Sequence, residues 1–258
     1  MLGSPSVPPI QLTNKSEIRR LLNADRDWSL FALADLDDGL FEHCDWWTVP
    51  DALVLVFRAI SIRPIFVLGD VRPVRQLLAA LPVGSGYLNL KSDQLAAAEG
   101  IFRYGKRHEM RRMILDTFEP RTGETEALGA VDCDEIERLY STGDGGGIAF
   151  APYQLETGLF RGIRRGRELV AVAGVHVASR EEGVAALGNI FTRPDCRGQG
   201  LAQIATSAVA LAVRRAGVET IGLNVETSNT AAIHAYEHIG FRTRFSYFEG
   251  PASRTDAV

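Results

Sequence analysis

The sequence has few cysteines, no excess of basic residues and no long apolar run. Its 258 residues include only three cysteines, and these are too widely spaced in the chain to indicate a zinc site or a redox pair. A formal net charge of −4 disfavours a nucleic-acid-binding protein or a polybasic membrane binder, whose binding surfaces are basic. No apolar segment approaches the roughly 20 residues of a membrane-spanning helix. We therefore expect a protein that binds no metal, nucleic acid or membrane.

The first residues, "MLGSPSVPPIQLTNK", carry prolines and polar side chains where a signal peptide has an apolar core. The sparse, odd number of cysteines suits a reducing compartment. Both features predict a cytoplasmic location.

Two halves of the chain show a similar order of elements. Hydrophobic residues make up 46% and charged residues 23%, an ordinary balance for a globular protein, and the length is comfortable for two domains. The order strand–strand–helix–strand–helix–strand is expected over 52–116 and again over 168–250. We predict an α/β fold with a mixed sheet, domains at 1–125 and 126–258, and a turn-rich linker between Asp116 and Asp132.

In the second half, the strands expected at 158–163, 168–178 and 184–192 are consecutive and antiparallel. Asp132 and Glu135 have the spacing of a capping box at the start of a helix. Further elements follow as a helix at 201–216, a strand at 220–225, a helix at 229–239 and a strand at 241–250. The core-facing stripe predicted for the helix at 201–216 consists of Leu201, Ile204, Ala205, Ala208, Leu211 and Ala212.

The segment "FTRPDCRGQGLA" places two glycines directly before this helix. Exposed N–H groups in a first helical turn, approached through glycine, favour an anion such as phosphate. A nucleotide P-loop is excluded because Leu201 and Ala202, not Lys and Ser or Thr, follow Gly200. A dinucleotide-binding fingerprint is disfavoured because Gln203 stands where its third glycine belongs.

The remaining pattern, Arg/Gln-x-x-Gly-x-Gly/Ala, is met by the six residues from Arg197 to Ala202 and resembles the pyrophosphate loop of the GNAT superfamily of acyl-CoA N-acyltransferases. The later segment "NVETSNTAAIHAYEHIGF" is similar to the closing motif of the same superfamily, with Asn229 and Tyr236 at its key positions. The resemblance covers about 132 to 250, and within the superfamily it is most similar to the tandem-domain, glycine N-acyltransferase-like branch. It implies a GNAT-like fold, with a catalytic C-terminal domain and a degenerate GNAT-like N-terminal domain.

The resemblance also implies how acetyl-CoA, or another short acyl-CoA, is held. Free N–H groups of a splayed strand would bind the pantetheine arm and the thioester oxygen, and the glycine loop would bind the pyrophosphate. Asn229 and Ala232 would contact the pantetheine or diphosphate region, and Tyr236 would protonate the leaving thiolate or hydrogen bond to the sulfur. The implied acyl-CoA-binding residues are Ile190, Phe191, Thr192, Arg197, Gly198, Gln199, Gly200, Leu201, Ala202, Asn229, Ala232 and Tyr236.

The general base is left open, because the strand "VAALGNIFT" lacks the glutamate that many GNAT relatives carry there. The candidates are His176, Glu226 or a water relay to either, against the alternatives that His176 is a structural sheet residue and that Glu226 caps a helix. Asn189 is expected to form a bulge or to contact substrate. Cys196 is interpreted as exposed packing.

These features predict an N-acetyltransferase that moves an acetyl or short acyl group to the primary amine of a small molecule or amino acid. It would use no metal and act as a monomer or homodimer. The alternative is a CoA-binding sensor or scaffold without turnover. The acceptor site is expected beside the loop "STGDGGGIAFAP" and His176, with a possible contribution from the N-terminal half.

Overall fold

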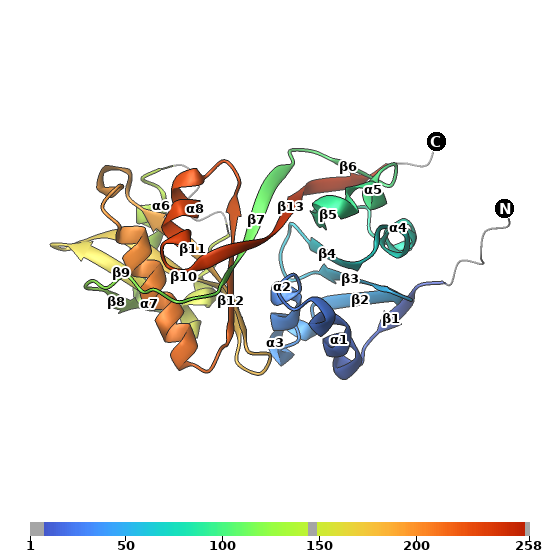
Figure 1. Cartoon of the computed structure of the whole chain (residues 1–258), viewed down its shortest axis with the longest axis horizontal. Helices are drawn as coiled ribbons and strands as arrows, with labels where there is room; N and C mark the ends of the chain where they lie inside the picture. Colours follow the sequence, from blue (N-terminus) through green and yellow to red (C-terminus); the bar gives the residue numbers. More distant parts are fainter. Residues whose placement is uncertain (1–7, 144–148, 256–258) are drawn as a thin grey trace. The chain divides into compact units, whose positions relative to one another are not determined.

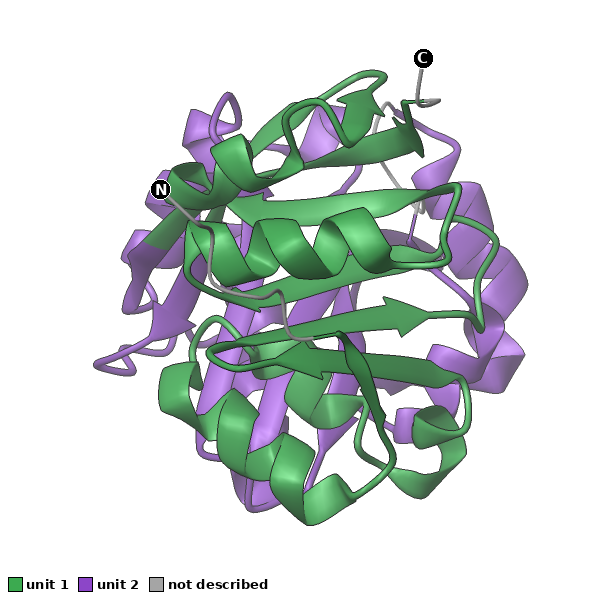
Figure 2. Ribbon diagram, turned by 90° about the vertical axis from the view of Figure 1, so that its right-hand side faces the viewer, with its two compact units in different colours: residues 1–111, 245–258 green, residues 112–244 purple. Residues whose placement is uncertain are grey.

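The computed structural model describes residues 8–143 and 149–255, which form two compact units (Figures 1 and 2). Unit 1 comprises 1–111 and 245–258, and unit 2 comprises 112–244. Two strands carry the chain from one unit to the other, namely β7 (His108–Leu115) and β13 (Phe241–Arg254).

Unit 1 is built on a mixed sheet in the order β1-β2-β3-β4-β5-β13, with β6 paired to β13. β4 and β5 are parallel, and the other neighbouring strands are antiparallel. Its elements are β1 (Ile10–Leu12), α1 (Lys15–Leu22), α2 (Leu30–Ala34), α3 (Asp38–Phe41), β2 (Cys44–Val49), β3 (Ala52–Phe57), β4 (Pro64–Gly69), α4 (Val71–Ala80), β5 (Ser85–Lys91), α5 (Leu95–Ala98) and β6 (Phe102–Tyr104).

Both faces of the unit 1 sheet are covered, because its central strands are apolar on both sides. α4 packs on one face, where Val67 belongs to the core, and Figure 2 shows this helix lying across the sheet. Side chains alternate along β4, so Phe66 points to the other face, where its ring centroid lies 5.7 Å from that of Trp28. The buried Trp28 indole donates a 2.7 Å hydrogen bond from Nε1 to the Val67 carbonyl.

Unit 2 contains the sheet order β7-β12-β11-β10-β9-β8. β9, β10 and β11 are consecutive and antiparallel, which confirms that prediction, while β12 runs parallel to β11. Its elements are β8 (Glu126–Leu128), α6 (Cys133–Tyr140), β9 (Phe160–Arg165), β10 (Glu168–Ser179), β11 (Val184–Thr192), α7 (Leu201–Arg215), β12 (Thr220–Glu226) and α8 (Thr230–Glu237). α6 and α7 both pack on β10. The predicted mixed α/β architecture is confirmed.

The two units share one order of elements and exchange their last strands. In unit 1 the order is β3-β4-α4-β5-α5, and in unit 2 it is β10-β11-α7-β12-α8. After α5 and the short β6, the chain runs through β7 into unit 2, where β7 lies beside β12. After α8 it runs through β13 into unit 1, where β13 pairs with β5 from Tyr247 to Ser253. Each sheet is therefore finished by residues from the other half of the chain.

The buried face of α7 differs from the predicted stripe. Of the predicted residues only Ala205 is fully buried, and Leu211 is 37% exposed. The residues that face the core are Ala205, Thr206, Ser207, Val209, Ala210 and Val213. Leu201 and Ile204 are partly buried and pack against the core, so the predicted stripe is right for these two and Ala205 and wrong for the exposed Leu211.

The segment expected to be a linker is packed into unit 2. Within it, β8 pairs with β9, and the Arg121 N–H donates a 2.9 Å hydrogen bond to Ser207 Oγ on α7. Gly123 lies so close to Ile204 that a Cβ there would be 2.8 Å from its Cγ2. The linker prediction is therefore wrong.

The predicted capping box is also wrong. Asp132 precedes α6, but its carboxylate accepts from the Gly129 N–H at 2.9 Å, and no side-chain cap bond forms at that helix end. Glu135 instead forms a bidentate ion pair with Arg164, at 2.6 and 2.7 Å. An ion pair to a residue on β9 has displaced the local cap.

In the part of the chain that the structure describes, no helix combines the length and apolar character needed to cross a membrane.

Candidate functional site

β11 and β12 separate at their carboxyl ends. Their parallel pairing begins at Val184↔Thr220 and its last pair is Leu187↔Leu223. β11 then continues to Thr192 and β12 to Glu226, with no further pair between them among the described residues. The two strand ends form the sides of an open splay.

Backbone N–H groups of β11 point into this splay. The Arg193 N–H donates to the Val170 carbonyl of β10 at 2.9 Å. Because N–H directions alternate along an antiparallel strand, the N–H groups of Thr192 and Ile190 point away from β10, toward the side on which β12 no longer pairs. The N–H of Phe191 points to β10. By this alternation, two of the three predicted β11 residues direct their N–H groups toward the splay.

Asn189 produces a β-bulge at the start of the splay. Val172 pairs with Phe191 and Gly174 pairs with Gly188, so two β11 residues lie opposite one β10 residue. Asn189 has φ = 54°, a left-handed conformation that is uncommon outside glycine. Of the two alternatives from the sequence, the bulge is confirmed.

The glycine loop leaves the first turn of α7 uncapped. Gly198 and Gly200 both have φ = 75°, and Gly200 occupies the N-cap position without a side-chain cap bond. A Cβ on Gly198 would meet no described atom within 4 Å, so the backbone is open on that side. Exposed first-turn N–H groups and open backbone together favour an anionic ligand.

Two arginines lie beside this loop. Arg197 Nε donates to the Thr192 carbonyl at 3.1 Å, and its guanidinium lies 5.7 Å from the Phe191 ring centroid. Arg165, from β9, donates to the Gln199 side-chain oxygen. Neither arginine has a carboxylate partner among the described residues, so each retains charge for an anionic ligand.

Cys196 was expected to be exposed, but it is buried at 1% exposure. Arg165 and Arg193 each direct a guanidinium nitrogen toward its Sγ, at 3.7 and 3.6 Å. The thiol packs under the loop, where it is not accessible for chemistry.

The N-terminus of α8 carries the second predicted motif. Asn229 is the N-cap residue, and its Oδ1 accepts from the Ala232 N–H at 3.2 Å. Tyr236 is 7% exposed, and its ring lies 6.1 Å from that of Phe241 in an edge-to-face arrangement. Burial raises the pKa of Tyr236 above its ordinary value, so the hydroxyl keeps its proton at neutral pH.

Residues 132–241 match the family model of the acetyltransferase (GNAT) family. The fold is GNAT-like. A Drosophila protein of known structure aligns over 96% of this chain and 98% of its own, with a TM-score of 0.66 and 14% identity. An acetyltransferase from the GNAT family of Colwellia psychrerythraea aligns over 95% and 99%, with a TM-score of 0.60 and 14% identity. A GCN5-related N-acetyltransferase from Kribbella flavida aligns over 89% and 96%, with a TM-score of 0.59 and 15% identity.

Among curated proteins, the chain is similar to the [ribosomal protein bS18]-alanine N-acetyltransferase of Escherichia coli. The two are 36% identical over 77 residues, which is 29% of this chain. The chain spans about half of that relative's length, 52%.

Within this GNAT-like unit, His176 lies directly over Gly188 on β11. A Cβ on Gly188 would be 2.0 Å from His176 Nε2, so the glycine is required for the ring to lie there. Burial lowers the pKa of His176 to about 4, which leaves the imidazole neutral at pH 7. Glu226 is exposed at the end of β12, and its carbonyl accepts from the Asn229 N–H at 2.9 Å.

Two residues with no sequence signal, Tyr140 and Gln154, contact the bulge. The Tyr140 hydroxyl donates to the Asn189 carbonyl at 2.9 Å, and Gln154 Oε1 accepts from Asn189 Nδ2 at 2.9 Å. No local pattern marks them, because they lie 49 and 35 positions away in sequence. Part of the loop expected to border the acceptor, 144–148, lies outside the described residues.

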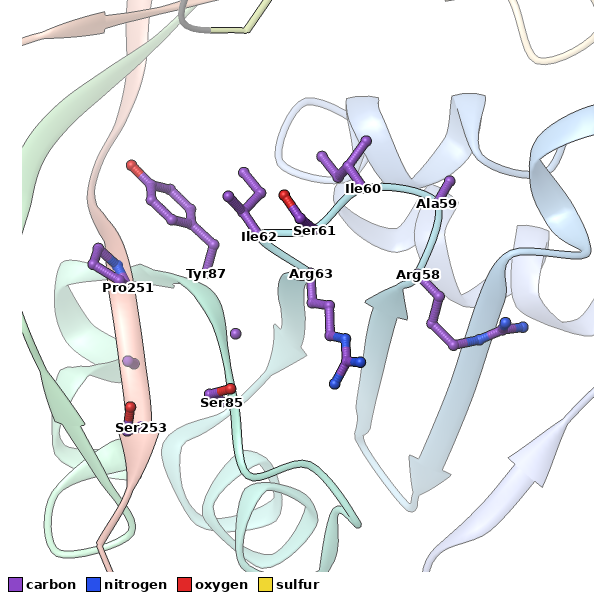
Figure 3. Close-up of a pocket in the computed structure, with 12 residues that line it drawn as sticks. Arg58, Ala59, Ile60, Ser61, Ile62, Arg63, Ser85, Tyr87, Pro251 and Ser253 are labelled. Carbon is purple, nitrogen blue, oxygen red and sulfur yellow. The ribbon is translucent and has the colours of Figure 1, made fainter.

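A separate hollow of about 630 Å³ lies in unit 1, and none of the predicted site residues lines it. It is formed by the loop between β3 and β4 together with parts of β5 and β13. Figure 3 shows Ile60, Ile62 and Tyr87 on one side of this loop and Arg58 and Arg63 on the other.

No group of three or more potential metal ligands is found in the described ranges 8–143 and 149–255.

Proposed function

We propose that the chain is an acyl-CoA-dependent N-acetyltransferase that moves an acetyl or short acyl group from acetyl-CoA to a primary amine. The observation that carries this proposal is the splay of β11 and β12 immediately before an uncapped, glycine-entered helix. A strand edge with free N–H groups suits an extended amide-containing arm, and a bare helix N-terminus suits a pyrophosphate. These two binding features follow one another in the chain, as they would along one acyl-CoA molecule.

The residues present fit such a ligand. Thr192 Oγ1 is buried without a hydrogen-bond partner among the described residues, as expected where a polar ligand completes the site. The loop 197–202 would hold the pyrophosphate through backbone N–H groups, with Arg197 adding charge. Because Asn229 Oδ1 already caps α8, its Nδ2 would be the group that contacts the pantetheine arm.

The reaction needs charge stabilisation at the thioester carbonyl. As the neutral amine adds to the carbonyl carbon, the carbonyl π electrons move to oxygen, and a backbone N–H of β11 would stabilise this charge without reorganising. The C–S bond then breaks and sulfur departs with the bonding pair. Tyr236, which burial keeps protonated, would donate its proton to this thiolate or hydrogen bond to the sulfur.

The amine must also lose a proton. His176 is neutral and lies against Gly188, where the splay begins, but with a pKa of about 4 it is a weak base. Glu226, at the end of β12, has an exposed carboxylate, and a water relay to either residue would serve. We propose one of these three routes. Kinetics of Glu226→Gln and His176→Gln across pH would distinguish them.

We propose a small molecule or amino acid as acceptor. Similarity to an alanine N-acetyltransferase of ribosomal protein bS18 adds a peptide N-terminus as a second class to test. A non-catalytic CoA sensor is the alternative function, and the lack of a glutamate on β11 supports it. A cytoplasmic location and a monomeric or homodimeric state stay predictions.

We also propose that residues 1–125 derive from a degenerate GNAT-like domain, as in tandem-domain, glycine N-acyltransferase-like proteins, and that 126–258 form the catalytic domain. The repeated order of elements supports this. In unit 1 the equivalent parallel pairing of β4 and β5 ends at Phe66↔Asn89, and the Trp28 indole binds the next carbonyl, that of Val67. A tryptophan therefore occupies the position at which a ligand would bind that strand.

The experiment is to incubate the protein with acetyl-CoA and a panel of amines, amino acids and an alanine-terminated peptide, and to measure free thiol release. Turnover with any acceptor supports the transferase. Binding of CoA with no thiol release supports the sensor. Failure to bind CoA would contradict both functions.

A further inference from the structure

The bulge in β11 decides which N–H groups face the splay. Its extra residue changes the phase of the strand, so that the Ile190 N–H points away from β10. Without the bulge, a regular β11 would present the alternate set of N–H groups. The geometry at Asn189 therefore controls a group proposed to contact the thioester.

The Asn189 backbone is held in its uncommon conformation by a hydrogen bond from another element. Tyr140, the last residue of α6, is 5% exposed, and its hydroxyl donates to the Asn189 carbonyl at 2.9 Å. The Tyr140 ring is fixed in turn by aromatic contacts with Phe150 and Phe191, at centroid distances of 5.5 and 5.7 Å. The peptide group that precedes the Ile190 N–H is thus fixed by a rigid donor.

The Asn189 side chain is held from the opposite direction. Its Nδ2 donates to Gln154 Oε1 at 2.9 Å and to the Val175 carbonyl at 3.3 Å. Gln154, at 4% exposure, also accepts from the Ala151 N–H at 3.0 Å and donates to the His176 carbonyl at 3.3 Å. Such a fully used amide has one orientation available to it.

We propose that Tyr140, Gln154 and Asn189 form a bulge clamp, a set of positioning residues that aim the Ile190 N–H at the thioester carbonyl oxygen. This inference rests on the proposed function and extends it to three residues that lie outside the sequence motifs. None of the three needs to touch the substrate. They act by fixing the direction of one backbone N–H group. Such a donor stabilises the transition state best when it is already oriented before negative charge develops on the thioester oxygen.

Substitution of a positioning residue and substitution of a merely structural residue should affect different measured quantities. The clamp serves the thioester carbonyl, and free CoA has no carbonyl at that place. Loosening the clamp should therefore lower kcat while the affinity for CoA is kept. A change that only loosens the fold would instead lower the melting temperature, or weaken CoA binding and kcat together.

The test uses the full chain with Tyr140→Phe and Asn189→Gly. The first variant removes only the hydroxyl, and the second removes the side-chain hydrogen bonds while glycine tolerates φ = 54°. We expect each to lower kcat about 10-fold, with the KM for acetyl-CoA and the Kd for CoA within twofold of wild type. Because both act on one bulge, the double variant should lose less than the product of the single effects.

Tyr247→Phe is the matched control, since it removes a buried tyrosine hydroxyl in unit 1 that donates to Glu249 at 2.9 Å. Its kcat should equal that of wild type. If the Tyr140→Phe and Asn189→Gly variants fold and keep the wild-type kcat, the clamp is overturned and the proposed transferase stays intact. The same conclusion follows if kcat and CoA affinity fall together in these variants. A wild-type protein without turnover toward any acceptor would overturn both proposals.

Discussion

At the scale of single residues, burial acts in opposite directions on two groups proposed for proton transfer. It lowers the pKa of His176 to about 4 and raises the pKa of Tyr236 above its ordinary value. Both shifts favour the uncharged form, as expected when a group leaves water. At neutral pH the site therefore presents a neutral imidazole and a protonated phenol.

The His176 shift predicts a pH dependence of stability. The folded pKa of about 4 lies below the ordinary 6.5, so the unfolded chain binds the proton more readily. This contribution to the free energy of unfolding is complete above pH 6.5 and is lost as pH falls toward 4, by up to about 3 kcal/mol. His176→Asn should flatten this part of the profile, measured by urea unfolding at pH 7.5 and 5. His234→Asn, the same substitution at an exposed position, is the control.

Tyr236→Phe should lower kcat about 100-fold, because a general acid typically contributes at least this factor. Since burial raises the Tyr236 pKa, ionisation of this residue should not lower the wild-type rate between pH 8 and 10. Steady-state kinetics across this range check both statements. Tyr104→Phe is a matched control, because that hydroxyl is buried without a hydrogen-bond partner among the described residues. A Tyr236→Phe variant with wild-type kcat would rule out the acid role.

At the scale of elements, α7 has a left-handed glycine near each end. Gly198 precedes the helix with φ = 75° and Gly217 follows it with φ = 86°, and a Cβ at either position would meet no described atom within 4 Å. Alanine at either position should therefore cost about 1 kcal/mol of folding free energy, from backbone strain alone.

The two substitutions should differ in ligand binding. Gly198→Ala places a methyl group on the proposed phosphate side of the loop and should weaken CoA binding at least 10-fold, whereas Gly217→Ala should leave it unchanged. Calorimetric titration with CoA, alongside urea unfolding of both variants, measures the difference. Equal CoA affinities would argue against a phosphate site at this loop.

The elements with strong local signals were predictable, and those decided by distant partners were not. β11 was predicted at its observed bounds because a glycine turn and a largely apolar run define it. β2 was not, because its sequence "CDWWTV" mixes charged and aromatic residues and only its pairing with β3 makes it a strand. Part of the buried face of α7 was missed because Ser207 faces the chain at Arg121, a contact 86 positions away.

The same division applies to the candidate site. The glycine loop and the Asn229 cap are local in sequence, so their conformations followed from residue type. The residues around Asn189 come from α6, β10 and the segment at 152–157, so no spacing rule could collect them. Roles for Tyr236, Glu226 and His176 stay predictions.

At the scale of the whole molecule, the exchange of β7 and β13 links the stability of the two units. Without β13 one edge of β5 in unit 1 would have no partner strand, and without β7 one edge of β12 in unit 2 would have none. We expect one cooperative unfolding transition. All three tryptophans belong to unit 1, so tryptophan fluorescence reports that unit while far-UV circular dichroism reports both. The two probes should give coincident urea midpoints, and a separate second transition would contradict this expectation.

The strand exchange also constrains the order of events during synthesis. β5 is complete at Lys91, yet the strand that pairs with it is made more than a hundred residues later and ends at Arg254. While the chain is still on the ribosome, unit 1 must therefore wait with an apolar, unpaired strand edge, which is a template for association with other chains. Expression of the first half alone should yield aggregates, and any nascent chain is exposed to this hazard until its last strand emerges.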